Sequence, residues 1–267
     1  MPVRTRWQGL RLLLFSALLA SHAAAEDRER LARAVASVAQ AVRSDPAALG
    51  PALAILSPEN REALRRLYGP DATRAVGAMR LADVPSVDTP AARDDALADF
   101  LGAQPELAEL AGAGLARALH QADAFYAGRG LPLPEAVKVI LSISFPREVL
   151  DGARVIVTGT EANLPALVNQ VQASVGDAVG GVSAVTIGDL VTFSEIPEAS
   201  AVDFWAHELQ HVVQYRRLGG IDAFAAVYST DYRKLEDDAN AVAGRALREA
   251  RDVLTVIHAL AGESTAR

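Results

Sequence analysis

One short segment of the sequence combines residue types and a spacing that suit a catalytic metal ion. His207, Glu208 and His211 form an H-E-x-x-H motif. On an α-helix, residues four apart lie on the same face, so both imidazoles can reach one ion. Glu208 projects about 100° around the helix from His207, so its carboxylate can act as general base on a metal-bound water without ligating the metal. The motif therefore predicts a zinc site with Glu208 as the base.

The absence of cysteine restricts what else such a site can use. The 267 residues include no cysteine, which excludes a disulfide framework, a thiol nucleophile and cysteine-ligated zinc or iron–sulfur sites. A third protein ligand must then be His, Asp or Glu. A metzincin would place a histidine six residues after His211, but that position is Arg217, so this class is excluded.

The third ligand is expected among acidic residues that follow the motif. Glu236, 25 residues after His211, would complete a His₂Glu site. Asp237 and Asp238 are the alternative ligands, although both would also be favourable as uncomplexed charges near a helix N-terminus. The helix that carries these acids has an apolar face beside Glu236, formed by Leu235, Ala239, Val242 and Ala243.

The motif needs a helix and a sheet to position it. Ser200 and Asp203 have the spacing of a capping box and predict a helix that begins at Ser200. This helix should end at Gly219-Gly220, a glycine stop. Residues 183–193 alternate apolar and polar side chains around Gly188-Asp189, which predicts a hairpin. A further strand is expected at 153–159, and a helix at 163–175.

Residues 26–127 are alanine-rich and lack catalytic spacing. Apolar periodicity and a Ser57-Pro58 start signal predict helices here, at residues 28–42, from Ser57 onward, at 91–101 and at 106–126. Two prolines make 84–90 a loop, and the turn-rich segment 128–134 separates this region from the rest. The region is interpreted as a helical packing unit or, alternatively, as a prosegment or partner-binding region.

The first 25 residues have the pattern of a secretory signal peptide. Arg4, Arg6 and Arg11 precede an apolar run, and small residues follow up to Ala25. The run is shorter than the roughly 20 residues that span a bilayer, so no stable membrane anchor is expected after cleavage. Losing three arginines would lower the formal charge from −7 to −10. We therefore expect a periplasmic or secreted protein without a nucleic-acid partner.

The motif and its surroundings resemble the gluzincin metallopeptidases. The resemblance lies in residues 206–214, in Gly219-Gly220 and in residues 235–240. More closely, the sequence resembles the small metallopeptidase-like domain associated with extracellular contractile injection systems, in which a strand segment similar to 184–193 precedes the motif helix. The resemblance covers about residues 131–247, is strongest over 185–243, and does not include 26–127.

This resemblance implies zinc held by His207, His211 and Glu236, with Glu208 as base. It also implies a carboxylate four residues after the third ligand that orients the first histidine, but this chain has Asn240 there. An amide oxygen can still accept the imidazole N–H, although it carries no charge. Gluzincins also need a donor for the tetrahedral oxyanion, and the choice is Tyr232, with Tyr215, Tyr228 and Arg233 as alternatives.

The expected fold is α+β, with three segments. Residues 1–25 are the signal peptide, 26–130 the helical region, and 131–267 a zincin-like domain whose small antiparallel sheet packs on the motif helix. The expected function is a secreted zinc metallopeptidase acting on peptide or protein substrates, which could pair with the edge of strand 190–193. The alternative is a catalytically weak zinc-binding protein that acts on a partner through residues 26–130. His120 is expected to be exposed, and His258 to lie in the core.

Overall fold

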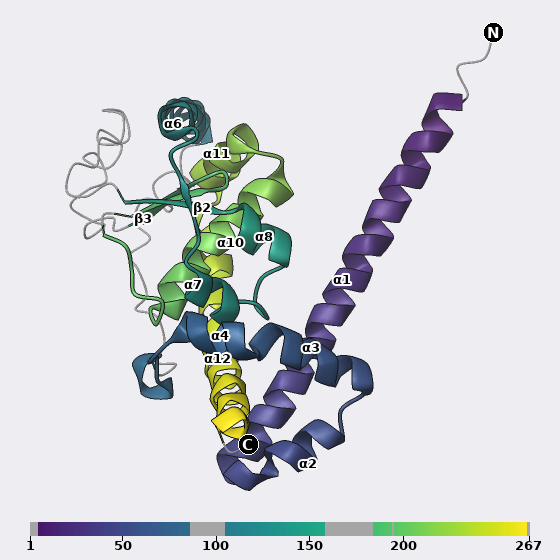
Figure 1. The fold of residues 1–267 in the computed structure, drawn as a ribbon. Coiled ribbons are helices and arrows are strands. Elements are labelled where there is room, and N and C mark those ends of the chain that lie inside the picture. Colours follow the sequence, from purple (N-terminus) through teal and green to yellow (C-terminus); the bar gives the residue numbers. More distant parts are fainter. Residues whose placement is uncertain (1–4, 86–104, 158–183, 194, 266–267) are drawn as a thin grey trace. The chain divides into compact units, whose positions relative to one another are not determined.

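The computed structural model describes residues 5–85, 105–157, 184–193 and 195–265 (Figure 1). The chain divides into two compact units. The terminal unit comprises Met1–Thr73 and Thr255–Arg267, and the central unit comprises Arg74–Leu254. The chain passes from one unit to the other after Thr73 and after Leu254, whereas its composition suggested a boundary near residue 130. The described chain is mainly helical with one small sheet, so the predicted α+β class is confirmed.

The terminal unit is built from helices that begin at side-chain caps. Helix α1 (Thr5–Ser44) packs against α2 (Leu49–Ala54) and α3 (Pro58–Tyr68). Ser57 Oγ accepts a hydrogen bond from the backbone N–H of Asn60 at 3.2 Å, with Pro58 in the first turn, as the sequence predicted. Asp45 caps the short 3₁₀ helix η1 (Pro46–Ala48) through the N–H of Ala47 at 2.9 Å.

The other elements, in chain order, are α4 (Pro70–Val76), η2 (Leu81–Asp83), α6 (Pro105–Tyr126), β1 (Leu131–Pro132), α7 (Glu135–Ile140), α8 (Arg147–Gly152), β2 (Arg154–Val157), β3 (Ala184–Ile187), β4 (Leu190–Phe193), α10 (Val202–Leu218), α11 (Ile221–Thr230) and α12 (Tyr232–Thr265). Helix α4 begins in the terminal unit, and α12 ends there.

The sheet has four strands in the order β1-β2-β4-β3. The predicted hairpin is confirmed: β3 and β4 pair antiparallel, and Gly188 occupies the turn with φ +60°. The expectation of a wholly antiparallel sheet was wrong, because β2 pairs parallel to β4. The proposed peptide edge on β4 was also wrong, since β4 lies between β2 and β3 and both of its edges are paired. Among the described strands, β3 is the outermost beside β4.

Helix α6 belongs to the core of the central unit. It packs along α11, and its buried residues join the cluster that contains residues of β3, β4, α10 and α12. The approach is close at Gly112, where an added Cβ would lie 2.6 Å from Ser229 Oγ. A larger residue there would require the Ser229 hydroxyl to move, while the backbone of α11 lies at ordinary contact distance, 3.5–3.6 Å. Residues 105–126 therefore pack in the same compact unit as the sheet and the motif helix.

Helix α10 contacts β3 and β4, so the sheet packs on the motif helix as expected. The predicted capping box was wrong: the N-cap is Ala201, and no side chain caps the helix. Ser200 Oγ instead donates to Glu198 Oε2 at 3.3 Å, and the buried Trp205 indole donates to the carbonyl of Glu198 at 3.0 Å. No side chain therefore accepts from the first N–H groups of α10, and the Trp205 indole instead fixes the segment that precedes the helix. The glycine stop is confirmed, with Gly219 left-handed at φ +100°.

Other sequence predictions have different outcomes. The helices expected at 91–101 and 163–175, and most of the loop at 84–90, lie outside the described residues. His120 is exposed, as predicted, and its Nε2 lies 3.0 Å from Asp222 Oδ1. His258 is exposed rather than buried, because it lies on the outer face of α12 while Val256 and Ile257 turn inward. In the part of the chain that is described, no helix has both the length and the apolarity to cross a membrane.

Candidate metal centre

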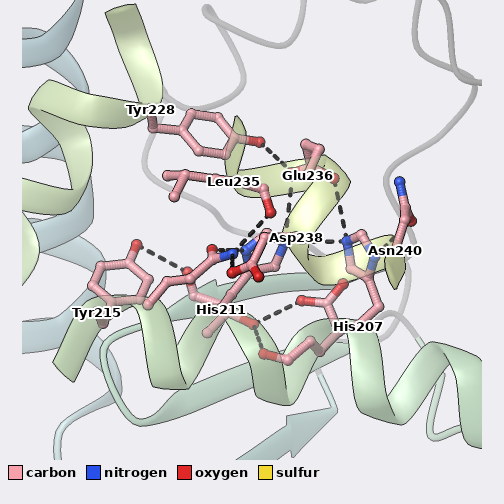
Figure 2. Close-up of polar contacts among 11 residues, drawn as sticks. His207, His211, Tyr215, Tyr228, Leu235, Glu236, Asp238 and Asn240 are labelled. Carbon is pink, nitrogen blue, oxygen red and sulfur yellow. Dashed lines mark hydrogen bonds and ion pairs between the residues drawn. The ribbon is translucent and has the colours of Figure 1, made fainter. Parts of the chain in front are cut away.

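His207, His211 and Glu236 come together in the central unit, as the sequence predicted. The histidines lie one turn apart on α10, and Glu236 lies in the first turns of α12 (Figure 2). His207 Nε2 is 3.1 Å from His211 Nε2 and 3.2 Å from Glu236 Oε2, and His211 Nε2 is 3.5 Å from Glu236 Oε1. All three side chains are buried, with exposures of 7–8%.

These separations suit a small tetrahedral ion. A tetrahedron with zinc–ligand bonds of about 2.0–2.1 Å has edges of about 3.3–3.4 Å. The distances from His207 Nε2 to His211 Nε2, 3.1 Å, and to Glu236 Oε2, 3.2 Å, lie just below that value, and the 3.5 Å from His211 Nε2 to Glu236 Oε1 involves the second carboxylate oxygen. Two imidazoles and one carboxylate also form a usual donor set for catalytic zinc, which leaves a fourth position open.

The far nitrogen of each imidazole contacts an amide oxygen. His207 Nδ1 lies 3.0 Å from Asn240 Oδ1, and His211 Nδ1 lies 2.8 Å from Gln214 Oε1. An amide oxygen can only accept, so both Nδ1 atoms must carry the proton. In the neutral tautomers, each Nε2 then has a lone pair, and these lone pairs face each other and the carboxylate.

The carboxylate is oriented in the same way. Tyr228 Oη donates to Glu236 Oε1 at 3.1 Å (Figure 2). Glu236 Oε2 is the buried side-chain atom of the described residues that receives no hydrogen bond. Burial alone would raise the pKa of Glu236, but the hydrogen bond with His207, the positive charge that either imidazole carries when it is protonated, and the hydrogen bond from Tyr228 hold that pKa below its usual value. Each of the three side chains thus has one polar atom that is partnered and one that is directed to a common point.

Such an arrangement is unfavourable without a cation. Two lone pairs and a carboxylate oxygen repel one another in a buried site, where few water molecules can screen them. A divalent cation, or protons on the imidazoles, removes the repulsion. The residues present therefore fit a metal ion, and in the described chain they form a group of metal-binding side chains with suitable spacing.

Glu208 is buried beside His207 and is held by the sheet. Thr186 Oγ1, on β3, donates to Glu208 Oε2 at 2.7 Å and lies 3.2 Å from the carbonyl oxygen of Glu208. Tyr215 Oη in turn donates to the carbonyl of Thr186 at 3.1 Å. Burial, followed by the nearby charge of Glu208, raises the pKa of Tyr215, so the phenol stays protonated. The predicted base therefore has a defined position, set by a strand residue.

The alternative ligands lie elsewhere. Asp237 is exposed and does not belong to the group of ligating side chains. Asp238 Oδ2 instead accepts hydrogen bonds from Gln210 Nε2 at 2.8 Å and Gln214 Nε2 at 3.0 Å. Burial tends to raise the pKa of Asp238, but these donors and Arg217 lower it overall. Asp238 thus joins α12 to α10 and leaves Glu236 as the acid that faces the histidines.

The residues considered as oxyanion donors occupy different places. Tyr215 is bound to Thr186, and Tyr228 to Glu236. The ring of Tyr232, the preferred donor, lies edge-on to Tyr228, with 4.7 Å between ring centroids. Arg233 is exposed on the first turn of α12. Of these residues, Tyr228 brings its hydroxyl to a candidate ligand, 3.1 Å from Glu236 Oε1.

Sequence reasoning did not identify Thr186, Gln210, Gln214 or the role of Asp238. Gln210 and Gln214 did carry a signal, since they repeat at i and i+4 along the motif helix and so share one face. Thr186 carried none, because its contact with Glu208 depends on how β3 packs against α10. Thr186 contacts the candidate base and Gln214 a candidate ligand, whereas Gln210 donates to Asp238, which also accepts from Gln214.

Comparison with known proteins gives one match. A family model described as the eCIS core domain matches residues 161–219, a segment that includes β3, β4 and the whole of α10. This match links the segment to extracellular contractile injection systems. It ends before Glu236. No curated protein and no solved structure matches the chain.

Proposed function

We propose that this protein is a zinc-dependent metallopeptidase of the gluzincin type. The observation that carries the proposal is the convergence of His207 Nε2, His211 Nε2 and Glu236 Oε2, with the second polar atom of each side chain bound to an amide or a phenol. Structural zinc sites use four protein ligands, whereas three ligands leave the position that a catalytic water occupies. Glu208, next to His207 and itself a non-ligand, supplies the base.

Bound zinc would supply a Lewis acid and lower the pKa of a bound water. The chain's own residues do the rest. Glu208 would act as the general base, accepting a proton from the water that attacks the peptide carbonyl and delivering it to the amine nitrogen as the C–N bond breaks. Thr186 holds Glu208 Oε2 for this transfer through its 2.7 Å hydrogen bond. Burial of the ligands at 7–8% exposure excludes bulk water from the face of the site that the protein covers.

A peptide or protein is the substrate class that suits this chemistry. An extended peptide can add to a sheet as a further strand. In the described sheet, β3 is the outermost strand next to the motif helix, and it carries Thr186. The acidic chain, with a formal charge of −7, does not suit nucleic acid. Secretion or a periplasmic location agrees with the link to extracellular injection systems.

The neutral Asn240 favours a second candidate function. A carboxylate at that position would raise the basicity of His207, and an amide does so less. A zinc-binding protein with little turnover, acting through a partner bound to residues 26–130, would also retain the three ligands. Enzyme assays separate the two candidates.

The test compares zinc content and cleavage of a broad peptide library for wild type and Glu208→Gln. We expect one zinc per chain in both proteins, and turnover lower by about 10²–10⁴-fold in the variant, the usual contribution of a general base. The matched control is Asp203→Asn. It also replaces an acid of α10 by its amide, but Asp203 lies in the first turn of the helix and is not one of the candidate ligands. Equal cleavage by wild type and Glu208→Gln would contradict the mechanism. Full zinc without turnover in wild type would favour the second candidate.

A further inference from the structure

Asp238 accepts hydrogen bonds from two glutamines of α10 that differ in one respect. Gln210 and Gln214 lie one turn apart, and the Nε2 atom of each donates to Asp238 Oδ2, at 2.8 and 3.0 Å. Arg217, one turn further, lies 3.5 Å from the same oxygen. Only the Gln214 side chain also contacts a candidate metal ligand, since its Oε1 is 2.8 Å from His211 Nδ1.

The orientation of the Gln214 amide is determined by its surroundings. Its Nε2 lies 2.8 Å from the carbonyl oxygen of Leu235 and 3.0 Å from Asp238 Oδ2, and both of these groups can only accept. A flipped amide would place its oxygen against two acceptors and its NH₂ against the imidazole. The side chain is completely buried, so water cannot take over either contact. Gln214 Oε1 must therefore face His211.

We infer that Gln214 and Asp238 are positioning residues that fix His211 as its Nδ1–H tautomer and so direct Nε2 to the metal position. The direction of hydrogen bonding runs from His211 Nδ1 to Gln214 Oε1, and from Gln214 Nε2 to Asp238 and Leu235. The edge of Phe224 against the imidazole, with ring centroids 6.1 Å apart, limits rotation on another side. The inference rests on the metal site of the proposed function, and peptide cleavage plays no part in it.

The same arrangement places amides rather than carboxylates against both imidazoles. Both imidazoles are oriented by neutral amides, Asn240 and Gln214, and the nearest carboxylate in this network, Asp238, acts through an intervening amide. Glu236 is then the acidic side chain of the ligand set itself. Asp238 contributes orientation without placing its charge on the histidine.

The test reads the tautomer and the metal separately. Long-range ¹H–¹⁵N spectra of the metal-free protein, at a pH of about 8 where an ordinary histidine is neutral, should show protonated Nδ1 on His211. Zinc affinity is measured by competition with a chelator. In Gln214→Leu, the fixed tautomer should be lost and zinc affinity should fall by about 10–100-fold, the usual effect of losing such a partner. Gln210→Leu is the matched control, because it removes the other amide from Asp238 without touching a histidine, and both readouts should stay close to wild type.

Changes at Asp238 keep the inference testable if the buried Gln214→Leu does not fold. Asp238→Ala should produce a smaller loss than Gln214→Leu, because the carbonyl of Leu235 still holds the amide. Asp238→Asn should keep the His211 tautomer and the zinc affinity close to wild type, unlike Asp238→Ala, because the amide oxygen of asparagine can accept from Gln214. Equal losses in the Gln214 and Gln210 variants would show a merely structural role, and an unchanged tautomer in Gln214→Leu would overturn the inference. Wild type that binds no zinc would overturn the metal site itself, whereas zinc binding without cleavage leaves this inference standing.

Discussion

The two compact units bury different kinds of side chain. In the described part of the terminal unit, the buried residues are apolar, such as Val35, Val38 and Leu64, apart from the phenol of Tyr68. Its charged pairs, such as Arg33 with Glu29, lie within one helix and are more than half exposed. Among the described residues of the central unit, by contrast, ten polar or charged residues are buried, and all ten lie between Ser144 and Glu236.

This difference separates packing from chemistry. A buried polar group costs free energy unless it is partnered, so a fold without a polar task buries few of them. In the central unit the partners come from distant segments, as with Thr186 and Glu208 or His207 and Asn240. Buried, partnered polar groups of this kind are typical of functional sites. The contrast predicts that substitutions in the terminal unit change only the stability of the fold, whereas substitutions in the central unit also change metal binding.

The largest effect is expected from removing the third ligand. Glu236→Ala should lower zinc affinity by more than the roughly 100-fold that loss of an orienting partner can cost, because it removes a ligand and leaves two facing imidazoles. Asp237→Ala, which changes the adjacent exposed acid, should bind zinc like wild type. Both are measured by metal analysis after dialysis and by chelator competition. Full zinc in Glu236→Ala would show that another group is the third ligand.

A leucine-to-alanine pair sharpens the comparison between the units. Leu64, in the terminal unit, is fully buried, and Leu235, beside Glu236, is 1% exposed. Each truncation to alanine should lower the free energy of unfolding by about 2–5 kcal/mol. Leu64→Ala should leave zinc affinity unchanged, whereas Leu235→Ala should lower it, because the residue packs next to a ligand and its carbonyl holds Gln214. Loss of zinc affinity in Leu64→Ala would show that the terminal unit also determines the site.

The same contrast explains which features the sequence could predict. Local rules identified the i, i+4 histidines, the Ser57 cap, the Gly188 turn and the Gly219 stop, because each depends on a few neighbouring residues. Glu236 could be chosen as the third ligand because an acid next to the apolar face of a helix lies close to the residues that the helix buries. The same reasoning was wrong for His258. The apolar run around it predicts a buried helix segment, but it does not show which residue of α12 faces outward.

Features that depend on distant packing could not be predicted. The parallel pairing of β2 with β4 requires a crossover that local alternation does not encode. The contact of Thr186 with Glu208 joins a strand and a helix, and the Ser200 hydroxyl, which was expected to cap α10, donates to Glu198 instead. Asp238 looked like a ligand because sequence spacing alone does not separate the faces that adjacent acids occupy on α12.

A third prediction concerns the residue that holds the proposed base. Thr186→Val removes the hydroxyl that donates to Glu208, with little change in shape. We expect kcat for peptide cleavage to fall about tenfold, equivalent to about 1.4 kcal/mol in the activation barrier, with KM and zinc content unchanged. Thr192→Val is the control, because Thr192 is also buried but bonds to the carbonyl of Val185. Thr186→Ser should recover most of the activity, and equal losses in both valine variants would contradict a positioning role.

The smallest effect on stability is expected for an exposed charged pair of the central unit. Such a pair should behave like the exposed pairs of the terminal unit. Asp151 accepts from Arg147 at 3.0 Å and lies 3.5 Å from Lys138, and its pKa is lowered mainly by the bond with Arg147. A lowered folded-state pKa stabilises the protein above the ordinary aspartate value of about 3.9, and the contribution is lost as pH falls through the folded-state pKa. Asp151→Asn should therefore be less stable than wild type near neutral pH, by about 0.2–1 kcal/mol for an exposed pair, and the difference should vanish at lower pH. Urea unfolding followed by the fluorescence of buried Trp205 measures it. A difference that persists at low pH would mean that Asp151 acts by packing, as the buried residues of this unit do.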